Sequence, residues 1–183
     1  TAHLAGALLL TALLKPFRAF TVMAAILLLQ ALLFADGGLL AYGCNVFNMA
    51  FFACFIAYPL IFKPLTAKGF NKKRLMTASI LSALAGVELG AFGVVAETFL
   101  SGVTQLPFSV FAALMLPIHL AIGLVEGITT GLILAFLYQY RPELFAENGR
   151  DAEPQACFGL GLAALIIGGA LSLTASELPG GLG

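Results

Sequence analysis

Long apolar runs without charge alternate with short charged or glycine-rich breaks along the chain. About 20 residues of apolar helix are enough to span the roughly 30 Å hydrocarbon core of a membrane. Each long run therefore predicts one membrane-crossing helix. The predicted helices cover residues 19–35, 39–62, 75–100, 108–140 and 155–174.

Two apolar runs depart from a simple crossing. Residues 4–14 are apolar but too short to span a membrane, and the charged break at 15–18 follows them directly. We therefore expect this helix to begin upstream of Thr1, in an N-terminal segment that precedes the present sequence. The run 108–140 is long and contains Pro117, so it predicts either one kinked helix or two shorter pieces.

The composition agrees with a membrane protein. Of the 183 residues 61% are hydrophobic and only 10% are charged, whereas an average soluble domain carries about 25% charged residues. So few charges cannot cover a water-facing surface. The predicted fold is all-α, a polytopic transmembrane bundle of about five to six helices that forms a single domain over residues 1–183. The 9 basic residues balance the 9 acidic ones, so no nucleic-acid partner is expected.

The positions of lysine and arginine predict the orientation of the bundle. They gather in alternate breaks, at residues 15–18, 63–74 and 141–154. Because cytoplasmic loops retain basic residues, these breaks are predicted on the cytoplasmic side, with 141–154 as a cytoplasmic loop. The N-terminal residues, including His3, are then predicted on the outer side.

The two histidines are candidate metal ligands, because imidazole is the commonest side-chain ligand of divalent transition metals. His3 precedes the first apolar run, and His119 lies about a third of the way down the run 108–140. The alternative for each is a hydrogen-bonded structural histidine. For His119, Pro117 favours this alternative, since proline leaves a carbonyl one turn earlier that an imidazole N–H can satisfy.

Four other polar side chains fall inside the apolar runs. Asn45 and Asn48 are three residues apart and share a helix face, where hydrogen bonding between helices is their simplest role. Glu88 and Glu126 lie at mid-membrane depth, where an ionised carboxylate is unfavourable, so each should be protonated, paired or in contact with water. The two glutamates leave open a channel or secondary carrier with an intramembrane proton or cation path.

The motifs of common enzymes and thiolate metal sites are absent from the sequence. It contains no GxxxxGK[ST], GxSxG or HExxH pattern. Cys44, Cys54 and Cys157 lie in apolar runs without CxxC spacing, where free thiols behave as small hydrophobic groups. A membrane enzyme or a purely structural subunit is therefore the weakest interpretation.

Three segments resemble the CbiM/NikM family, the substrate-binding membrane components of energy-coupling-factor transporters for cobalt and nickel. They are HLAGALLLTALLKPFRAF (3–20), LLLQALLFADGGLLAYGCNVFNMA (27–50) and PIHLAIGLVEGITTGLILAFL (117–137). The middle segment is the most specific, because its glutamine, its glycine pair and its two asparagines follow the family pattern over about 20 positions.

The resemblance implies a subunit that captures Ni(II) or Co(II) as transported substrate at the outer face, without organic cofactor or catalytic step. His3 would be a metal ligand, while Asn45, Asn48 and His119 would shape the site around it. The implied partners are a membrane coupling subunit, a pair of ATP-binding cassette ATPases, a small accessory membrane subunit and membrane lipid. The implied location is the cytoplasmic membrane of a bacterium or archaeon.

Overall fold

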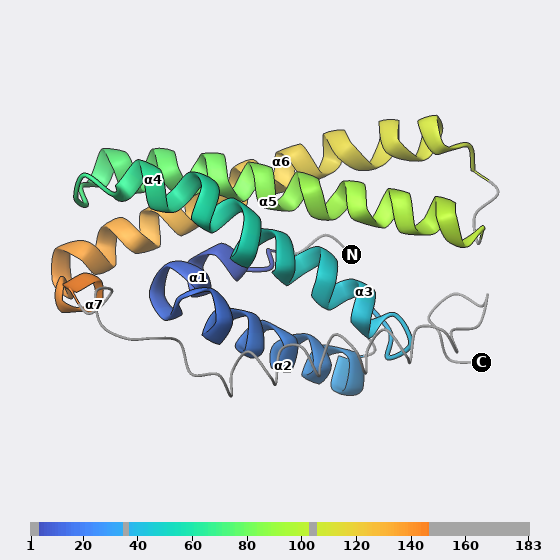
Figure 1. Cartoon of the computed structure of the whole chain (residues 1–183), viewed down its shortest axis with the longest axis horizontal. Coiled ribbons are helices and arrows are strands. Elements are labelled where there is room, and N and C mark those ends of the chain that lie inside the picture. Colours follow the sequence, from blue (N-terminus) through green and yellow to red (C-terminus); the bar gives the residue numbers. More distant parts are fainter. Residues whose placement is uncertain (1–3, 35–36, 103–105, 147–183) are drawn as a thin grey trace.

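The computed structural model describes residues 4–34, 37–102 and 106–146, and these ranges are helical without a strand (Figure 1). Four helical segments are long and apolar enough to cross a membrane: Pro16–Phe34, Tyr42–Thr66, Lys72–Ser101 and Phe108–Tyr140. The predicted all-α transmembrane bundle is thereby confirmed. The helices in chain order are α1 (Ala7–Leu14), α2 (Pro16–Phe34), α3 (Tyr42–Val46), the π-helix η1 (Phe47–Phe62), α4 (Lys63–Thr66), α5 (Lys72–Ser101), α6 (Phe108–Tyr140) and α7 (Glu143–Ala146).

Local capping explains where the long helices begin and end. Helix α5 starts three residues before its predicted first residue, because the side chain of Asn71 accepts a hydrogen bond from the backbone N–H of Arg74 at 2.8 Å. Helix α6 has its predicted bounds and continues through Pro117 as one helix. The predicted helix at 155–174, and the predicted loop at 141–154 beyond Ala146, lie outside the described residues.

The third apolar run forms an unexpected π-helix over 16 residues. In a π-helix each N–H bonds to the carbonyl five residues earlier, so the same face returns after more than four residues. Four of the six buried positions follow this repeat, with spacings of five, four and five residues: Asn48, Ala53, Ala57 and Phe62. These side chains therefore share one buried face although an α-helix would spread them around its axis.

Helices α5 and α6 form the closest pair of the bundle and lie side by side (Figure 1). Three glycines of α6, one turn apart, face α5: Gly123, Gly127 and Gly131. A Cβ atom on Gly127 would lie only 2.6 Å from the Cα atom of Ile80. The backbones are thus in direct contact, as in membrane helix pairs that use small residues to approach each other.

The break after η1 and the described part of the break after α6 lie at one end of the bundle. Figure 1 shows α4 and α7 at the same end, opposite the last turn of α5 and the first turn of α6. Aromatic contacts hold this end together. The ring centroid of Phe70 lies 6.1 Å from that of Tyr138 and 5.1 Å from that of Phe145. The loop that follows α4 therefore packs on the end of α6 and on α7.

Helix α1 begins near the middle of the bundle. It has eight residues and a length of about 12 Å, too short to cross a membrane. The expectation that this helix begins upstream of Thr1 was wrong, because the left-handed Gly6 starts the helix at Ala7. The backbone N–H of Ala5 donates to Oε2 of Glu126 at 3.0 Å. Glu126 is about 27 Å from the start of α6, a helix about 50 Å long. The segment before α1 therefore lies at mid-depth rather than at the outer end, while His3 itself is outside the described residues.

Candidate functional site

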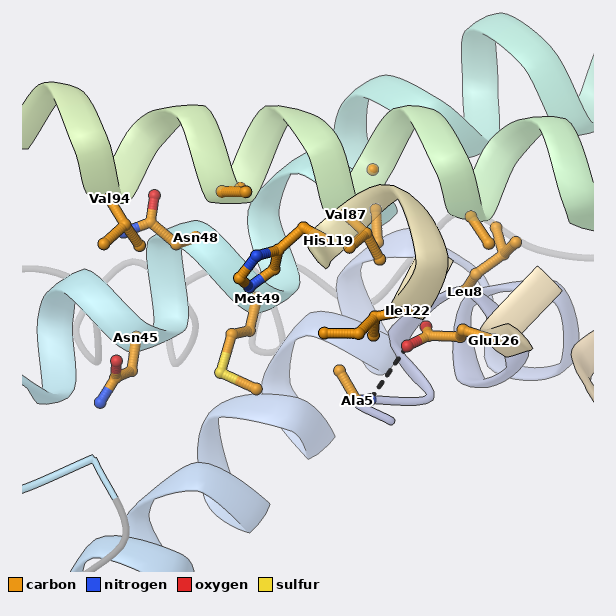
Figure 2. Close-up of a pocket in the computed structure, with 15 residues that line it drawn as sticks. Ala5, Leu8, Asn45, Asn48, Met49, Val87, Val94, His119, Ile122 and Glu126 are labelled. Atoms are coloured by element: carbon orange, nitrogen blue, oxygen red, sulfur yellow. Dashed lines mark hydrogen bonds between the residues drawn. The ribbon is translucent and has the colours of Figure 1, made fainter. Parts of the chain in front are cut away.

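A cavity of about 190 Å³ lies between α1, α3, η1, α5 and α6 (Figure 2). Its wall is mostly apolar, with four polar side chains, as is typical of small-ligand sites. The polar side chains are Asn45, Asn48, His119 and Glu126. The apolar lining comes from Ala5, Leu8, Met49, Ala53, Ala83, Gly86, Val87, Gly90, Ala91, Val94 and Ile122.

His119 presents one ring nitrogen for further bonding. Its Nδ1 lies 2.8 Å from the carbonyl oxygen of Met115, one turn earlier on α6. Because a carbonyl oxygen only accepts, Nδ1 must carry the proton, and Nε2 is left to bind a cation or another donor. The bonded carbonyl is that of Met115 rather than the one left free by Pro117, so the expected reason for this hydrogen bond was wrong. His119 lies about 17 Å from the start of α6.

Asn48 joins η1 to α5. Its Nδ2 donates to Oε2 of Glu97 at 2.7 Å, and the residue is only 6% exposed. The glycines of α5 leave room for it: a Cβ on Gly90 would collide with the Asn48 carbonyl oxygen, and one on Gly93 with Asn48 Oδ1. Among the described residues Oδ1 has no hydrogen-bond partner. The amide is therefore held firmly against α5 at the edge of the cavity.

Asn45 holds the turn that precedes α3. Its Nδ2 donates to the carbonyl oxygen of Gly37 at 3.1 Å. Gly37 has a φ angle of 77°, a left-handed conformation that suits glycine. This hydrogen bond ties the backbone at Gly37 to α3, which forms part of the cavity wall. The role of Asn45 in the structure is therefore to hold this turn in place.

The two predicted intramembrane glutamates occupy different surroundings. Glu126 is 4% exposed, lines the cavity and accepts the Ala5 hydrogen bond drawn in Figure 2. Glu88 is half-buried and does not line the cavity, and its Oε1 is buried without a hydrogen-bond partner in the described part of the chain. The structure thus brings Glu126 together with His119, Asn45 and Asn48, but leaves Glu88 outside this set.

Sequence reasoning missed Glu97 and Ala5 as parts of the site. Glu97 is half-buried and accepts a hydrogen bond from Asn48. The small residues of α5, at Ala83, Gly86 and Gly90, were the available signal, since they allow η1 to approach closely. The described residues contain no cluster of three His, Cys, Asp or Glu side chains that could hold a metal ion.

Replacing Glu97 with alanine should lower the free energy of unfolding by about 1–3 kcal/mol, because the buried amide of Asn48 would lose its acceptor. Thermal unfolding of the purified protein in detergent measures this loss. Glu97→Gln retains an acceptor oxygen and should lose less. Glu143→Ala, at an exposed position on α7, is the control. Equal stability of Glu97→Ala and the unaltered protein would contradict the prediction.

Comparison with known proteins identifies the family. Residues 1–144 match the model of the family CbiM, described as the cobalt uptake substrate-specific transmembrane region. The chain is 33% identical over 176 residues to the "Probable fused nickel transport protein LarMN" of Lactiplantibacillus plantarum, covering 90% of this chain and 53% of that protein. It is 31% identical over 181 residues to the fused nickel transport protein NikMN of Rhodobacter capsulatus, covering 91% of this chain and 52% of that protein.

A third relative is named as a cobalt transport protein. The chain is 30% identical over 139 residues to the cobalt transport protein CbiM of Thermosipho melanesiensis, covering 73% of this chain and 57% of that protein. The chain thus spans a little over half of the length of each of these relatives, and all three are named as transport proteins rather than enzymes. No solved structure matches the chain significantly. This chain is a multi-pass membrane protein and belongs to the CbiM family, whose model is described as a cobalt uptake region and whose relatives named here are nickel and cobalt transport proteins.

Proposed function

We propose that this chain is the substrate-binding membrane subunit of an ATP-driven importer and that it captures Ni(II) or Co(II) from the outer side of the membrane. The observation that carries the proposal is the family match over residues 1–144, with relatives named for nickel and for cobalt transport. The mostly apolar cavity with four polar side chains supports it, because it offers a small space with a few polar groups for a single cation.

The proposed metal ligand is His3, together with donors outside the described residues. Consecutive Cα atoms are 3.8 Å apart, so the Cα of His3 is no more than about 8 Å from that of Ala5, which lines the cavity. Imidazole nitrogen suits both Ni(II) and Co(II). In this proposal Asn45 and Asn48 fix the walls through the hydrogen bonds described above, and His119 contributes from the opposite wall without being the main ligand.

Energy for import is proposed to come from partner proteins. The 183 residues contain no phosphate-binding GxxxxGK[ST] pattern, so ATP hydrolysis is assigned to an ATP-binding cassette pair. A membrane coupling subunit would transmit the movement of that pair to the bundle, and a small accessory membrane subunit would complete the assembly. The lipid-facing apolar residues of α6, such as Leu124 and Leu132, are exposed and suit either lipid or the coupling subunit.

Uptake of radiolabelled Ni(II) into liposomes tests the proposal. The natural full-length chain is reconstituted alone, or with the coupling subunit and ATPase pair encoded with it. We expect the chain alone to bind metal without transporting it, and uptake to require both ATPases and hydrolysable ATP. Uptake by the chain alone down a metal gradient would contradict the proposal and favour the secondary carrier, in which Glu88 and Glu126 would form the path.

A further inference from the structure

The hydrogen bond between Ala5 and Glu126 joins two parts of the chain that are 121 residues apart. The acceptor belongs to a side chain with 4% exposure near the middle of α6, and the donor is a backbone N–H just before α1. A backbone N–H at the N-terminal end of a helix has no partner within that helix, so the Ala5 N–H needs a partner from elsewhere. A mid-membrane glutamate is itself unfavourable unless its position gives it a partner or a function.

We propose that Glu126 is a positioning residue that fixes the segment carrying His3 against α6, so that this wall of the cavity is already in place when the cation arrives. The inference rests on the proposed function and adds to it a residue that acts through the backbone of another segment. The contact that carries this positioning role is the hydrogen bond from the Ala5 N–H to Oε2 of Glu126, drawn as the dashed line in Figure 2.

Local capping does not hold the backbone around Ala5, so this segment depends on a contact with another helix. Helix α1 begins with Gly6 at its N-terminal cap, and no side chain there accepts a hydrogen bond from the first turn. Gly6 has a φ angle of 70° and open space around it, so its own packing does not hold the chain. The backbone before α1 is therefore fixed by its contact with α6 rather than by local capping.

Helix α6 is rigid at the position of Glu126. The next residue, Gly127, lies against the backbone of Ile80, and Gly123 lies one turn earlier against Leu84. Because both neighbours of Glu126 on this side are in backbone contact with α5, the carboxylate is held at a fixed depth. A bond from such a position restrains the backbone at Ala5, just before α1.

Three variants of the natural full-length protein test the proposal. Glu126→Ala removes the acceptor, Glu126→Gln retains an acceptor oxygen, and Ala5→Pro removes the donated hydrogen while leaving Glu126 intact. Glu143→Gln, an exposed carboxylate beside Arg141 at the other end of the chain's described part, is the matched control. The two measurements are the hydrogen–deuterium exchange of the peptide covering residues 4–10 and the dissociation constant for Ni(II), both in detergent or nanodiscs.

Glu126→Ala and Ala5→Pro should each weaken Ni(II) binding about 10- to 100-fold, the range typical when a group that orients a ligand is lost. Exchange in the peptide should become at least about tenfold faster in Glu126→Ala, as expected for local opening. Glu126→Gln should stay within about threefold of the unaltered protein in both measurements, and the double variant Glu126→Ala/Ala5→Pro should bind no more weakly than either single one.

Unchanged exchange in Glu126→Ala would overturn the proposal. So would a Glu126→Gln protein that exchanges slowly yet binds Ni(II) as weakly as Glu126→Ala, because the charge would then act on the metal directly. If Glu126→Ala does not fold, Ala5→Pro and Glu126→Gln decide. Failure of the proposed function is distinguishable, because the unaltered protein would then bind no Ni(II) while the exchange measurement still reports on the restraint.

Discussion

Replacing His3 with alanine in the natural full-length protein should weaken Ni(II) and Co(II) binding by at least about a hundredfold. Loss of a group that only orients a metal ligand typically lowers metal affinity about 10- to 100-fold. Loss of a ligand itself should therefore lower the affinity by at least about 100-fold. A hundredfold corresponds to about 2.8 kcal/mol of binding free energy. Titration calorimetry of the purified protein with each cation measures the change.

The second histidine provides the comparison for this variant. His119→Gln retains a polar group on the opposite wall of the cavity and should weaken binding by about tenfold or less, because His119 is not the main ligand in the proposed site. If His119→Gln abolished binding and His3→Ala left it unchanged, the metal would bind through α6, and the assignment of His3 would be wrong.

Replacing Gly127 with leucine should destabilise the protein by about 3 kcal/mol or more. The Cβ atom alone would lie 2.6 Å from the Cα of Ile80 and 3.2 Å from the carbonyl oxygen of Ser79, and backbone atoms cannot move aside as a flexible side chain can. Overpacking of this kind typically lowers the free energy of unfolding by about 1–3 kcal/mol. A leucine at this position would force the backbones of α5 and α6 apart, so the loss should be at or above the upper end of that range. The apparent Tm in detergent should fall by roughly 6–12 °C.

Ala121→Leu, on an exposed position of the same helix, is the matched control for the added volume. It should leave the Tm within a few degrees, because the larger side chain meets lipid or detergent rather than α5. A Gly127→Leu protein as stable as Ala121→Leu would show that α5 and α6 are not packed backbone to backbone.

The helices could be predicted because their ends are encoded locally. Charged and glycine-rich breaks separate apolar runs of membrane length, and Pro107, Asn71 and Pro16 each occupy a position where a helix begins or is capped. The grouping of Asn45 and Asn48 on one wall also follows from short-range spacing. These features depend on residues within a few positions of each other, so the sequence shows them directly.

The contacts between residues of different helices could not be predicted from the sequence in the same way. The run containing η1 is apolar on all sides, so no periodicity distinguishes a π-helix from an α-helix there. The depth of α1 depends on the Ala5–Glu126 bond, and the burial of Glu97 depends on Asn48. Each is a pairing between distant segments, fixed by the rotation and depth of whole helices, which hydrophobicity along one chain does not specify.

The backbone contact along Gly127 has a consequence for transport. Helices α5 and α6 must tilt as one body, since neither can slide or rotate without separating from the other. Glu97 belongs to one member of this body and Glu126 to the other, and each binds a different neighbouring segment. In the proposed transport cycle, movement of η1 or of the start of α1 away from this pair should therefore be accompanied by rupture of one of these two bonds.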